Sequence, residues 1–197
     1  PMSEEEKQEV SAIYSAAGQL EDGTLIQERP FVSPHHTVSV YAMTGGGAVP
    51  KPGMVTLAHR GVLFLDEMAE FKRQTLDVLR QPMEEGKIFL ARSRGNFVYP
   101  ADFMLLGATN PCPCGYYPDR NRCRCQDWEV RRYLARLSGP LLDRMDLCCQ
   151  IKQTPIRKLW EKREASYIDS DKNGSKWMRE QVLEARERQQ MRCRGAA

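Results

Sequence analysis

Two unbroken apolar runs in the middle of the chain each lead into polar residues. Residues 62–65 run directly into Asp66 and Glu67. Residues 103–108 lead in the same way to Asn110. Such runs are typical of parallel strands buried on both faces, and ligands of parallel sheets bind beyond the carboxyl ends of the strands. The pattern predicts an α/β fold, a parallel sheet flanked by helices, with polar groups collected at one edge of the sheet.

Apolar residues at helical spacing predict helices around these strands. They cover residues 3–17, 70–85, 127–137 and about 176–192. Ser3 opens the first helix with the pattern of a capping box, and Pro82 is expected to bend or end the second. Toward the C-terminus the composition becomes charged and polar, with a linker at 169–174. We therefore expect two parts, residues 1–152 and residues 153–197, the second beginning a helical C-terminal segment.

Residues 21–53 are rich in Gly, Pro, His and Thr and are expected to form an insert or long loop, with a β-like stretch at 37–41. His35 and His36 would face opposite ways in an extended segment, which favours a structural or interface role over a shared metal. A glycine run here imitates a phosphate loop, but Pro50 stands where a glycine N–H is needed. The G-x-x-x-x-G-K-[ST] motif of a phosphate loop occurs nowhere in the sequence.

Composition narrows the classes of function. The formal charge of the 197 residues is only +3, so contact with nucleic acid would have to come from local basic clusters. Hydrophobic content of 41% is ordinary for a globular chain. No run approaches the roughly 18 apolar residues of a membrane span, and the first residues lack the basic and apolar regions of a signal peptide. We expect a cytoplasmic protein without a membrane partner.

The acid pair and Asn110 carry the chemistry that phosphoryl transfer requires. Asp66 can hold the water shell of Mg²⁺ while Glu67 orients or deprotonates the water that attacks a γ-phosphate. The amide of Asn110 can hold the same water. The alternatives are a strand that ends in a charged helix start for the two acids, and a turn cap for Asn110.

Four of the seven cysteines lie close together in the sequence, as the pairs Cys112-x-Cys114 and Cys123-x-Cys125. Two thiolate pairs can fold together around a tetrahedral structural Zn²⁺. The spacing is shorter than the two intervening residues of the usual zinc knuckle, so unliganded thiols and a disulfide remain alternatives.

Basic residues gather in two places. Residues 87–91 and 97–99 predict a β-hairpin with an arginine-bearing tip, formed by Arg92 and Arg94, and Lys87 begins its first strand. The second group could contact phosphates or be a solvated surface, and comprises Arg120, Arg122, Arg124, Arg131, Arg132 and Arg136.

Several motifs in this order match one protein family. They are Phe31-x-x-Pro34-His35-His36, Gly45-Gly46-Gly47, residues 57–67, Asn110-Pro111-Cys112-Pro113-Cys114-Gly115 and residues 138–144, which end in Leu141-Leu142-Asp143-Arg144. Through them the chain resembles the magnesium-chelatase-like ComM/YifB family of AAA+ ATPases over nearly the whole of residues 4–151.

That resemblance implies a P-loop NTPase-type motor of the helix-2-insert clade that uses ATP and Mg²⁺, and whose competence-associated members act as hexameric branch-migration DNA helicases. It implies that Asp66 and Glu67 are the Walker B pair, Asn110 is sensor 1 and Arg144 is an arginine finger. The hairpin with Lys87, Arg92 and Arg94 would be the pre-sensor hairpin, which faces a central pore and meets the DNA backbone there. The stretch before Gly53 would be the helix-2 insert.

The resemblance also implies that the family's Walker A loop would precede Ser3, and that its sensor 2 arginine would follow the last residue. We therefore expect residues 1–152 to be a AAA+ core without Walker A, which alone binds ATP weakly and does not hydrolyse it. Two alternatives share this fold: a chelatase-type motor that drives metal insertion through a partner protein, and a non-catalytic regulatory module.

Overall fold

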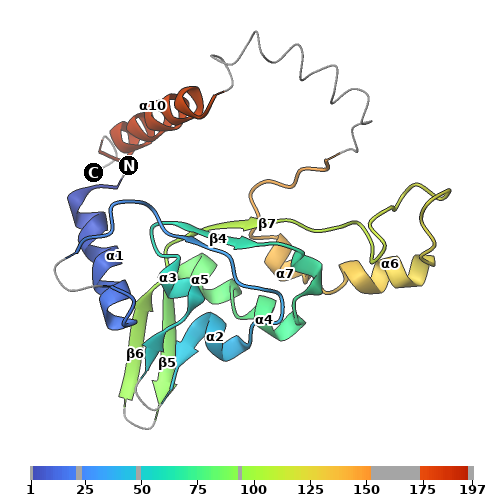
Figure 1. Cartoon of the computed structure of the whole chain (residues 1–197), viewed down its shortest axis with the longest axis horizontal. Helices are drawn as coiled ribbons and strands as arrows, with labels where there is room; N and C mark the ends of the chain where they lie inside the picture. The colour runs from blue at the N-terminus through green and yellow to red at the C-terminus, as the bar shows by residue number, and fades with distance from the viewer. Residues whose placement is uncertain (1, 21–23, 48–49, 93–94, 152–173, 195–197) are drawn as a thin grey trace. The chain divides into compact units, whose positions relative to one another are not determined.

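The computed structural model describes residues 2–20, 24–47, 50–92, 95–151 and 174–194 (Figure 1). The chain divides into two units, residues 1–148 and 149–197. The described part of the second unit consists mainly of one long helix, α10 (Ser175–Arg194). The linker expected at residues 169–174 lies almost wholly outside the described residues. Whether the two units are an ATPase core and the beginning of a lid stays a prediction.

The first unit is built on a parallel sheet of three strands, β1 (Phe31–Val32), β4 (Val62–Leu65) and β7 (Met104–Gly107), in the order β1-β4-β7. Val62 pairs with Met104 and Leu65 with Gly107, so β4 and β7 end together. The predicted α/β fold with a parallel sheet is confirmed.

Two antiparallel ribbons accompany this sheet. The strands β2 (Gly45–Gly46) and β3 (Lys51–Pro52) form the smaller one. The strands β5 (Lys87–Arg92) and β6 (Gly95–Pro100) form a longer hairpin, which Figure 1 shows projecting beside α2. The hairpin predicted from the two β-prone runs is confirmed.

Helices accompany these strands in the first unit. They are α1 (Glu4–Ala16), α2 (Val40–Thr44), α3 (Met54–Leu57), the 3₁₀ helix η1 (Met68–Glu70), α4 (Arg73–Asp77), α5 (Arg80–Glu85), α6 (Asp127–Leu134) and α7 (Gly139–Leu142). Ser3 caps α1 with the predicted capping box, since its side chain accepts from the N–H of Glu6 and the Glu6 carboxylate accepts from the N–H of Ser3.

The single helix predicted over residues 70–85 is wrong, because the segment divides into η1, α4 and α5. Phe71 and Lys72 have extended backbone between the first two. Pro82 does not end the last helix. It lies in the first turn of α5, where a missing N–H breaks no helical hydrogen bond, and the helix ends at Gly86 with a left-handed φ of 64°.

The described residues of the stretch 21–53 take part in the core of the fold, whereas the sequence predicted an insert or long loop. They contribute β1 to the main sheet, and Met43 is fully buried in the core. The β-like run expected at residues 37–41 is wrong, because α2 begins at Val40. Ser39 caps that helix by accepting a hydrogen bond from the N–H of Ala42 at 3.1 Å, and a capped helical turn satisfies backbone groups that an isolated strand would leave unpaired.

The core lies on one face of the sheet. Leu63 and Leu65 point into it with Met43, Phe71 and Leu79, all nearly or fully buried. The opposite face is exposed, with Phe31 at 64%, Met104 at 63% and Leu106 at 50%. The expectation that both apolar runs are buried on both faces is therefore wrong within the described chain, because strand geometry sends alternate side chains to opposite faces and only one face is covered.

Candidate functional site

The carboxyl ends of β4 and β7 form one edge of the sheet. Hydrogen bonds continue beyond the strands, from the N–H of Ala108 to the carbonyl of Leu65 at 2.9 Å and from the N–H of Met68 to the carbonyl of Ala108 at 2.8 Å. Asp66 and Glu67 lie between these two bonds, and the exposed Asn110 follows the second strand at the same edge. The structure therefore brings the three predicted residues to one edge, while their roles in catalysis stay predictions.

Glu67 has an unusual backbone. Its φ of 49° and ψ of 43° lie in the left-handed region, which non-glycine residues enter rarely. Its N–H donates to Oδ1 of Asp66 at 2.8 Å, so the first acid of the pair stabilises the turn that displays the second. Both side chains are exposed, as a site for a hydrated ion requires.

A histidine approaches this acid pair. Nδ1 of His36 lies 3.5 Å from a carboxylate oxygen of Glu67, close enough for an ion pair when the imidazole is protonated. The rings of His35 and His36 are 4.1 Å apart, so the expectation that they face opposite ways is wrong. Residues 36 and 37 form a turn instead of extended backbone. Sequence reasoning missed His36 because the contact joins segments far apart in the chain.

Asn110 lies beside the cysteine loop. A Cβ built on Gly115 would stand 3.9 Å from both Cγ and Oδ1 of Asn110. Gly115 itself is bound by its N–H to the carbonyl of Cys112 at 3.0 Å. The Asn110 amide therefore lies near the loop as well as close to the end of its strand.

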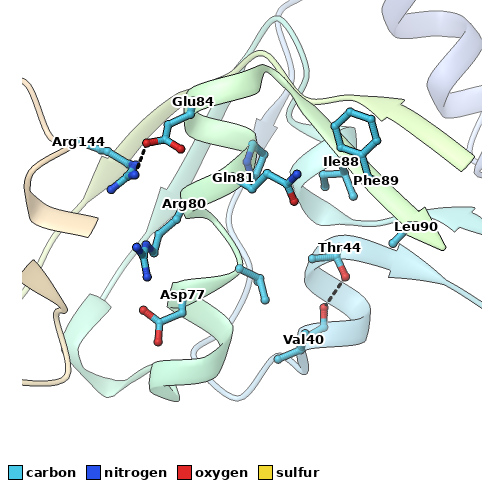
Figure 2. A pocket seen from close by; sticks show the side chains of 12 residues that line it. Val40, Thr44, Asp77, Arg80, Gln81, Glu84, Ile88, Phe89, Leu90 and Arg144 are labelled. Atoms are coloured by element: carbon cyan, nitrogen blue, oxygen red, sulfur yellow. Dashed lines mark hydrogen bonds and ion pairs between the residues drawn. The ribbon is translucent and has the colours of Figure 1, made fainter. Parts of the chain in front are cut away.

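Arg144 follows α7 and points into its own chain (Figure 2). Its guanidinium forms an ion pair with Glu84 of α5 and donates to the carbonyl of Pro140. These groups border an open pocket of about 460 Å³, which Asp77 and Arg80 also line. The structure therefore places the predicted arginine finger in contact with Glu84 of α5. A role in a neighbouring subunit's site is untested.

The hairpin presents two different faces. Ile88 and Leu90 are buried against the core, while Phe89 and Val98 are exposed. Lys87 is exposed at the beginning of β5. Arg92 ends that strand, opposite Gly95 in the register. Arg94 lies outside the described residues.

The four clustered cysteines converge although they belong to separate pairs. All four Sγ atoms lie within 4.8 Å of one another, and the cluster could hold a metal ion. The Sγ atoms of Cys112 and Cys114 are 3.3 Å apart, so a single intervening residue does not prevent the two sulfurs from converging. The backbone N–H of Tyr116 stabilises the thiolate of Cys114 and lowers the pKa of this thiol to about 6.

Two of the six clustered arginines form ion pairs within the chain. Arg120 pairs with Asp127, and Arg136 pairs with Glu70 at 2.8 Å. Arg122 stacks over the ring of Tyr116 at 4.0 Å. All six are exposed, including Arg124, Arg131 and Arg132.

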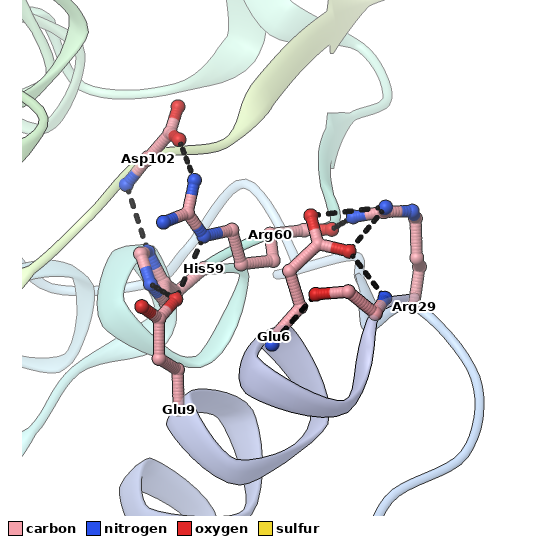
Figure 3. A network of polar contacts seen from close by, with 7 residues as sticks. Glu6, Glu9, Arg29, His59, Arg60 and Asp102 are labelled. Atoms are coloured by element: carbon pink, nitrogen blue, oxygen red, sulfur yellow. Dashed lines mark hydrogen bonds and ion pairs between the residues drawn. The ribbon is translucent and has the colours of Figure 1, made fainter. Parts of the chain in front are cut away.

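A polar network missed by sequence reasoning positions the amino ends of the same strands (Figure 3). Arg60 bridges Glu9 of α1 at 2.8 Å and Asp102 at 2.6 Å. Nδ1 of the buried His59 accepts from the N–H of Asp102 at 3.1 Å, and Nε2 lies 3.3 Å from Glu9. Burial lowers the pKa of His59, with the charge of Arg60 acting in the same direction. The network joins α1 to the segments that enter β4 and β7.

Comparison with known proteins adds independent findings. A family model described as magnesium chelatase, subunit ChlI, matches residues 1–159. YifB of Salmonella typhimurium is 46% identical over 192 residues, 98% of this chain and 37% of the relative. The competence protein ComM of Haemophilus influenzae is 44% identical over 167 residues, 85% of this chain and 31% of the relative. The magnesium-chelatase 38 kDa subunit of Acidiphilium rubrum is 28% identical over 111 residues, 56% of this chain and 26% of the relative.

The chain thus spans about 37% of the length of the first of these relatives. Among the described residues, no helix combines the length and apolar character needed to cross a bilayer. The resemblance stated from the motifs agrees with the family match over most of the chain. The chain belongs to the magnesium chelatase ChlI family, with YifB and ComM among its relatives.

Proposed function

We propose that this chain is part of an ATP-hydrolysing AAA+ motor that remodels DNA in the manner of a branch-migration helicase. The observation that carries the proposal is the shared edge of β4 and β7, where Asp66, Glu67 and Asn110 follow strands that end in register. Parallel sheets bind nucleotides at this edge.

Each residue of the edge has a distinct part in the proposed reaction. Asp66 holds Mg²⁺ through a water molecule, so the ion can bridge and neutralise the terminal phosphates of ATP. Glu67 orients the attacking water and accepts its proton, and Asn110 holds the same water through its amide. In this proposal the left-handed turn at Glu67 presents its exposed carboxylate to the attacking water.

In the proposed reaction, a positive charge comes from a neighbouring subunit of an oligomer. We place Arg144 at the γ-phosphate of a neighbouring subunit in a homo-oligomeric, hexameric ring, where a guanidinium stabilises the charge that develops in transfer. Its ion pair with Glu84 is then the contact that it exchanges on assembly. ATP turnover would therefore require the ring.

DNA is the proposed substrate of the motor. We propose that the hairpin of β5 and β6, which contains Lys87 and Arg92, follows a translocating strand, and that Arg94, outside the described residues, acts with them. The similarity to a competence protein favours DNA as the partner.

The test is ATP hydrolysis by the longer protein that contains this chain. We expect turnover that rises on addition of forked DNA and that Glu67→Gln lowers by roughly 10²–10⁴-fold with nucleotide binding retained. Glu5→Gln, a change of the same kind on the exposed side of α1, is the control and should leave turnover intact. ATP turnover that does not rise with forked DNA, or that is unchanged in Glu67→Gln, would contradict the proposal.

A chelatase-type motor is the second candidate, because the family model is that of a magnesium chelatase subunit and a chelatase subunit is among the relatives. Such a motor drives insertion of a metal through a partner protein. It predicts ATP turnover that responds to a porphyrin and partner subunits, and that is indifferent to forked DNA.

A further inference from the structure

The loop from Pro111 to Gln126 lacks the support that loops of this length usually need. It contains no helix or strand, and loops longer than about 12–15 residues without secondary structure are uncommon in compact domains. Its buried side chains are Cys112 and Cys123, which pack with Val130 of α6. Apolar burial of this extent is small, so another interaction must hold the loop.

The sulfur atoms have the spacing of a mononuclear metal site. Four thiolates around a tetrahedral ion with Zn–S bonds of about 2.3 Å stand about 3.8 Å from one another. The described separations are 3.8 Å between Cys112 and Cys123, 3.6 Å between Cys114 and Cys123 and 3.3 Å between Cys112 and Cys114. The thiols are not joined as disulfides, whose sulfurs lie about 2.0 Å apart.

We propose that these four cysteines bind one Zn²⁺ as a closed structural site, and that the ion fixes the position of Asn110. Tetrahedral sites of four sulfurs select soft ions such as zinc. The second half of the proposal rests on the proposed function of Asn110, whereas the metal site itself does not.

The surroundings of the cluster suit this ion. Zn²⁺ with four thiolates carries a formal charge of about −2, and arginines flank every cysteine of the second pair. Arg120 donates to the carbonyl of Cys125 at 3.1 Å, and Arg122 and Arg124 alternate with Cys123 and Cys125. The N–H of Tyr117 points to Sγ of Cys112 at 3.4 Å, a backbone contact typical of a thiolate in a metal knuckle.

The loop connects the metal cluster to the sheet edge. Asn110 stands two positions before Cys112, and its amide lies near Gly115 inside the loop, where an added Cβ would stand 3.9 Å from it. At its other end the loop enters α6, and Arg136, which follows this helix, donates to the carbonyl of Ala69 in η1 at 2.9 Å. A fixed loop therefore holds Asn110 between two anchors, and a loop without metal leaves it attached to β7 alone.

The first test is the metal content of the protein purified without chelator. We expect about one equivalent of zinc per chain, and a Co²⁺-substituted form with the visible absorption of a tetrahedral thiolate site. Cys114→Ser should reduce zinc to less than roughly a tenth of this amount. Cys148→Ser is the matched control, because Cys148 is an exposed cysteine away from the cluster, and it should retain full zinc.

Iron in place of zinc, a disulfide seen as the loss of two hydrogens in the intact mass, or full zinc in Cys114→Ser would overturn the metal site. If the variant is insoluble, removal of zinc from the unmodified protein with EDTA, followed by titration with Zn²⁺, gives the stoichiometry directly. Binding of other than about one ion per chain would again refute the site.

The second test is amide hydrogen exchange across residues 108–126, with and without zinc. We expect removal of the metal to raise exchange in this segment at least about tenfold while β4 and the hairpin stay protected. Zinc that binds without changing exchange at residues 108–115 would overturn the positioning of Asn110. If the longer protein with its zinc bound does not hydrolyse ATP, this result contradicts the proposed function and leaves the zinc site unaffected.

Discussion

Single residues at the strand ends do more than the sequence pattern suggested. The carboxylate of Asp66 accepts a hydrogen bond from the N–H of Glu67 and is also a candidate ligand of hydrated Mg²⁺. Glu67 adopts left-handed backbone and contacts His36. The adjacent acids therefore form a turn in which the conformation of one depends on the side chain of the other.

The pKa of His59 gives a prediction at this scale. Burial keeps the folded-state pKa below the ordinary value of 6.5, so between the two values the unfolded chain binds more protons than the folded one. The free energy of unfolding should therefore fall as the pH drops below about 7, and this part of the loss should stop below the folded pKa. Urea unfolding followed from about pH 7.5 to 5.5 measures the slope.

His59→Asn should flatten this slope, because Asn keeps an acceptor for the N–H of Asp102 but does not titrate. His35→Asn, at an exposed histidine, should leave the slope as it is. An unchanged slope in His59→Asn would show that His59 does not cause it, and Glu6 and Glu9 are not the cause in this range either, because their pKa values are lowered from 4.5.

At the scale of elements, contacts between strands depend on close backbone approach. Gly61 precedes β4, and a Cβ at this position would stand 2.1 Å from the carbonyl oxygen of Pro30. That carbonyl accepts the hydrogen bond from Val62 at 2.8 Å, which begins the pairing of β1 with β4. The sequence marks this glycine only as the start of an apolar run.

We expect Gly61→Ala to destabilise the protein by roughly 1–3 kcal/mol, because the added methyl must displace backbone atoms. Gly139→Ala is the control, since a Cβ at Gly139 meets no atom within 4 Å. Denaturant midpoints of the two variants measure the difference. Equal midpoints would mean that β1 does not pair with β4 in solution.

The hairpin of β5 and β6 gives a second prediction for an element. If it contacts the DNA backbone, Lys87→Gln in the longer protein should weaken binding across sequences and reduce the slope of log K against log salt by about one. Lys72→Gln, at an exposed lysine before α4, is the control. Fluorescence anisotropy with a labelled strand at several salt concentrations gives both slopes, and identical slopes would remove Lys87 from the interface.

At the scale of the whole molecule, the position of Arg144 links assembly to activity. Its guanidinium is occupied by Glu84 within the same chain, whereas the proposed reaction needs it at a neighbouring subunit. A site completed by two subunits has a specific consequence in mixtures of variants.

In the longer protein, Arg144→Ala should lower ATP turnover by roughly 10³-fold or more with ATP binding retained. Mixing it with Glu67→Gln should restore part of the turnover, because some interfaces then combine an intact Glu67 with an intact Arg144. ATP hydrolysis at increasing mixing ratios measures this recovery. A mixture no more active than its components would mean that Arg144 acts within its own chain.

The sequence by itself determined the local features. The apolar runs at residues 62–65 and 103–108 predicted β4 and β7, and Ser3 predicted the start of α1, because periodicity and capping depend on neighbours along the chain. It also placed Asp66, Glu67 and Asn110 at strand ends, and the motifs around them indicated the family.

The tertiary structure alone decided which of these pieces meet. The contact of His36 with Glu67, the pairing of Arg144 with Glu84 and the convergence of four sulfurs join residues distant in sequence. The tertiary structure also decided that Met104 is exposed, on a strand for which the sequence pattern predicted full burial. Such contacts depend on how strands and loops pack across the sheet, and a pattern along one strand records which side chains are apolar but not which face another element covers.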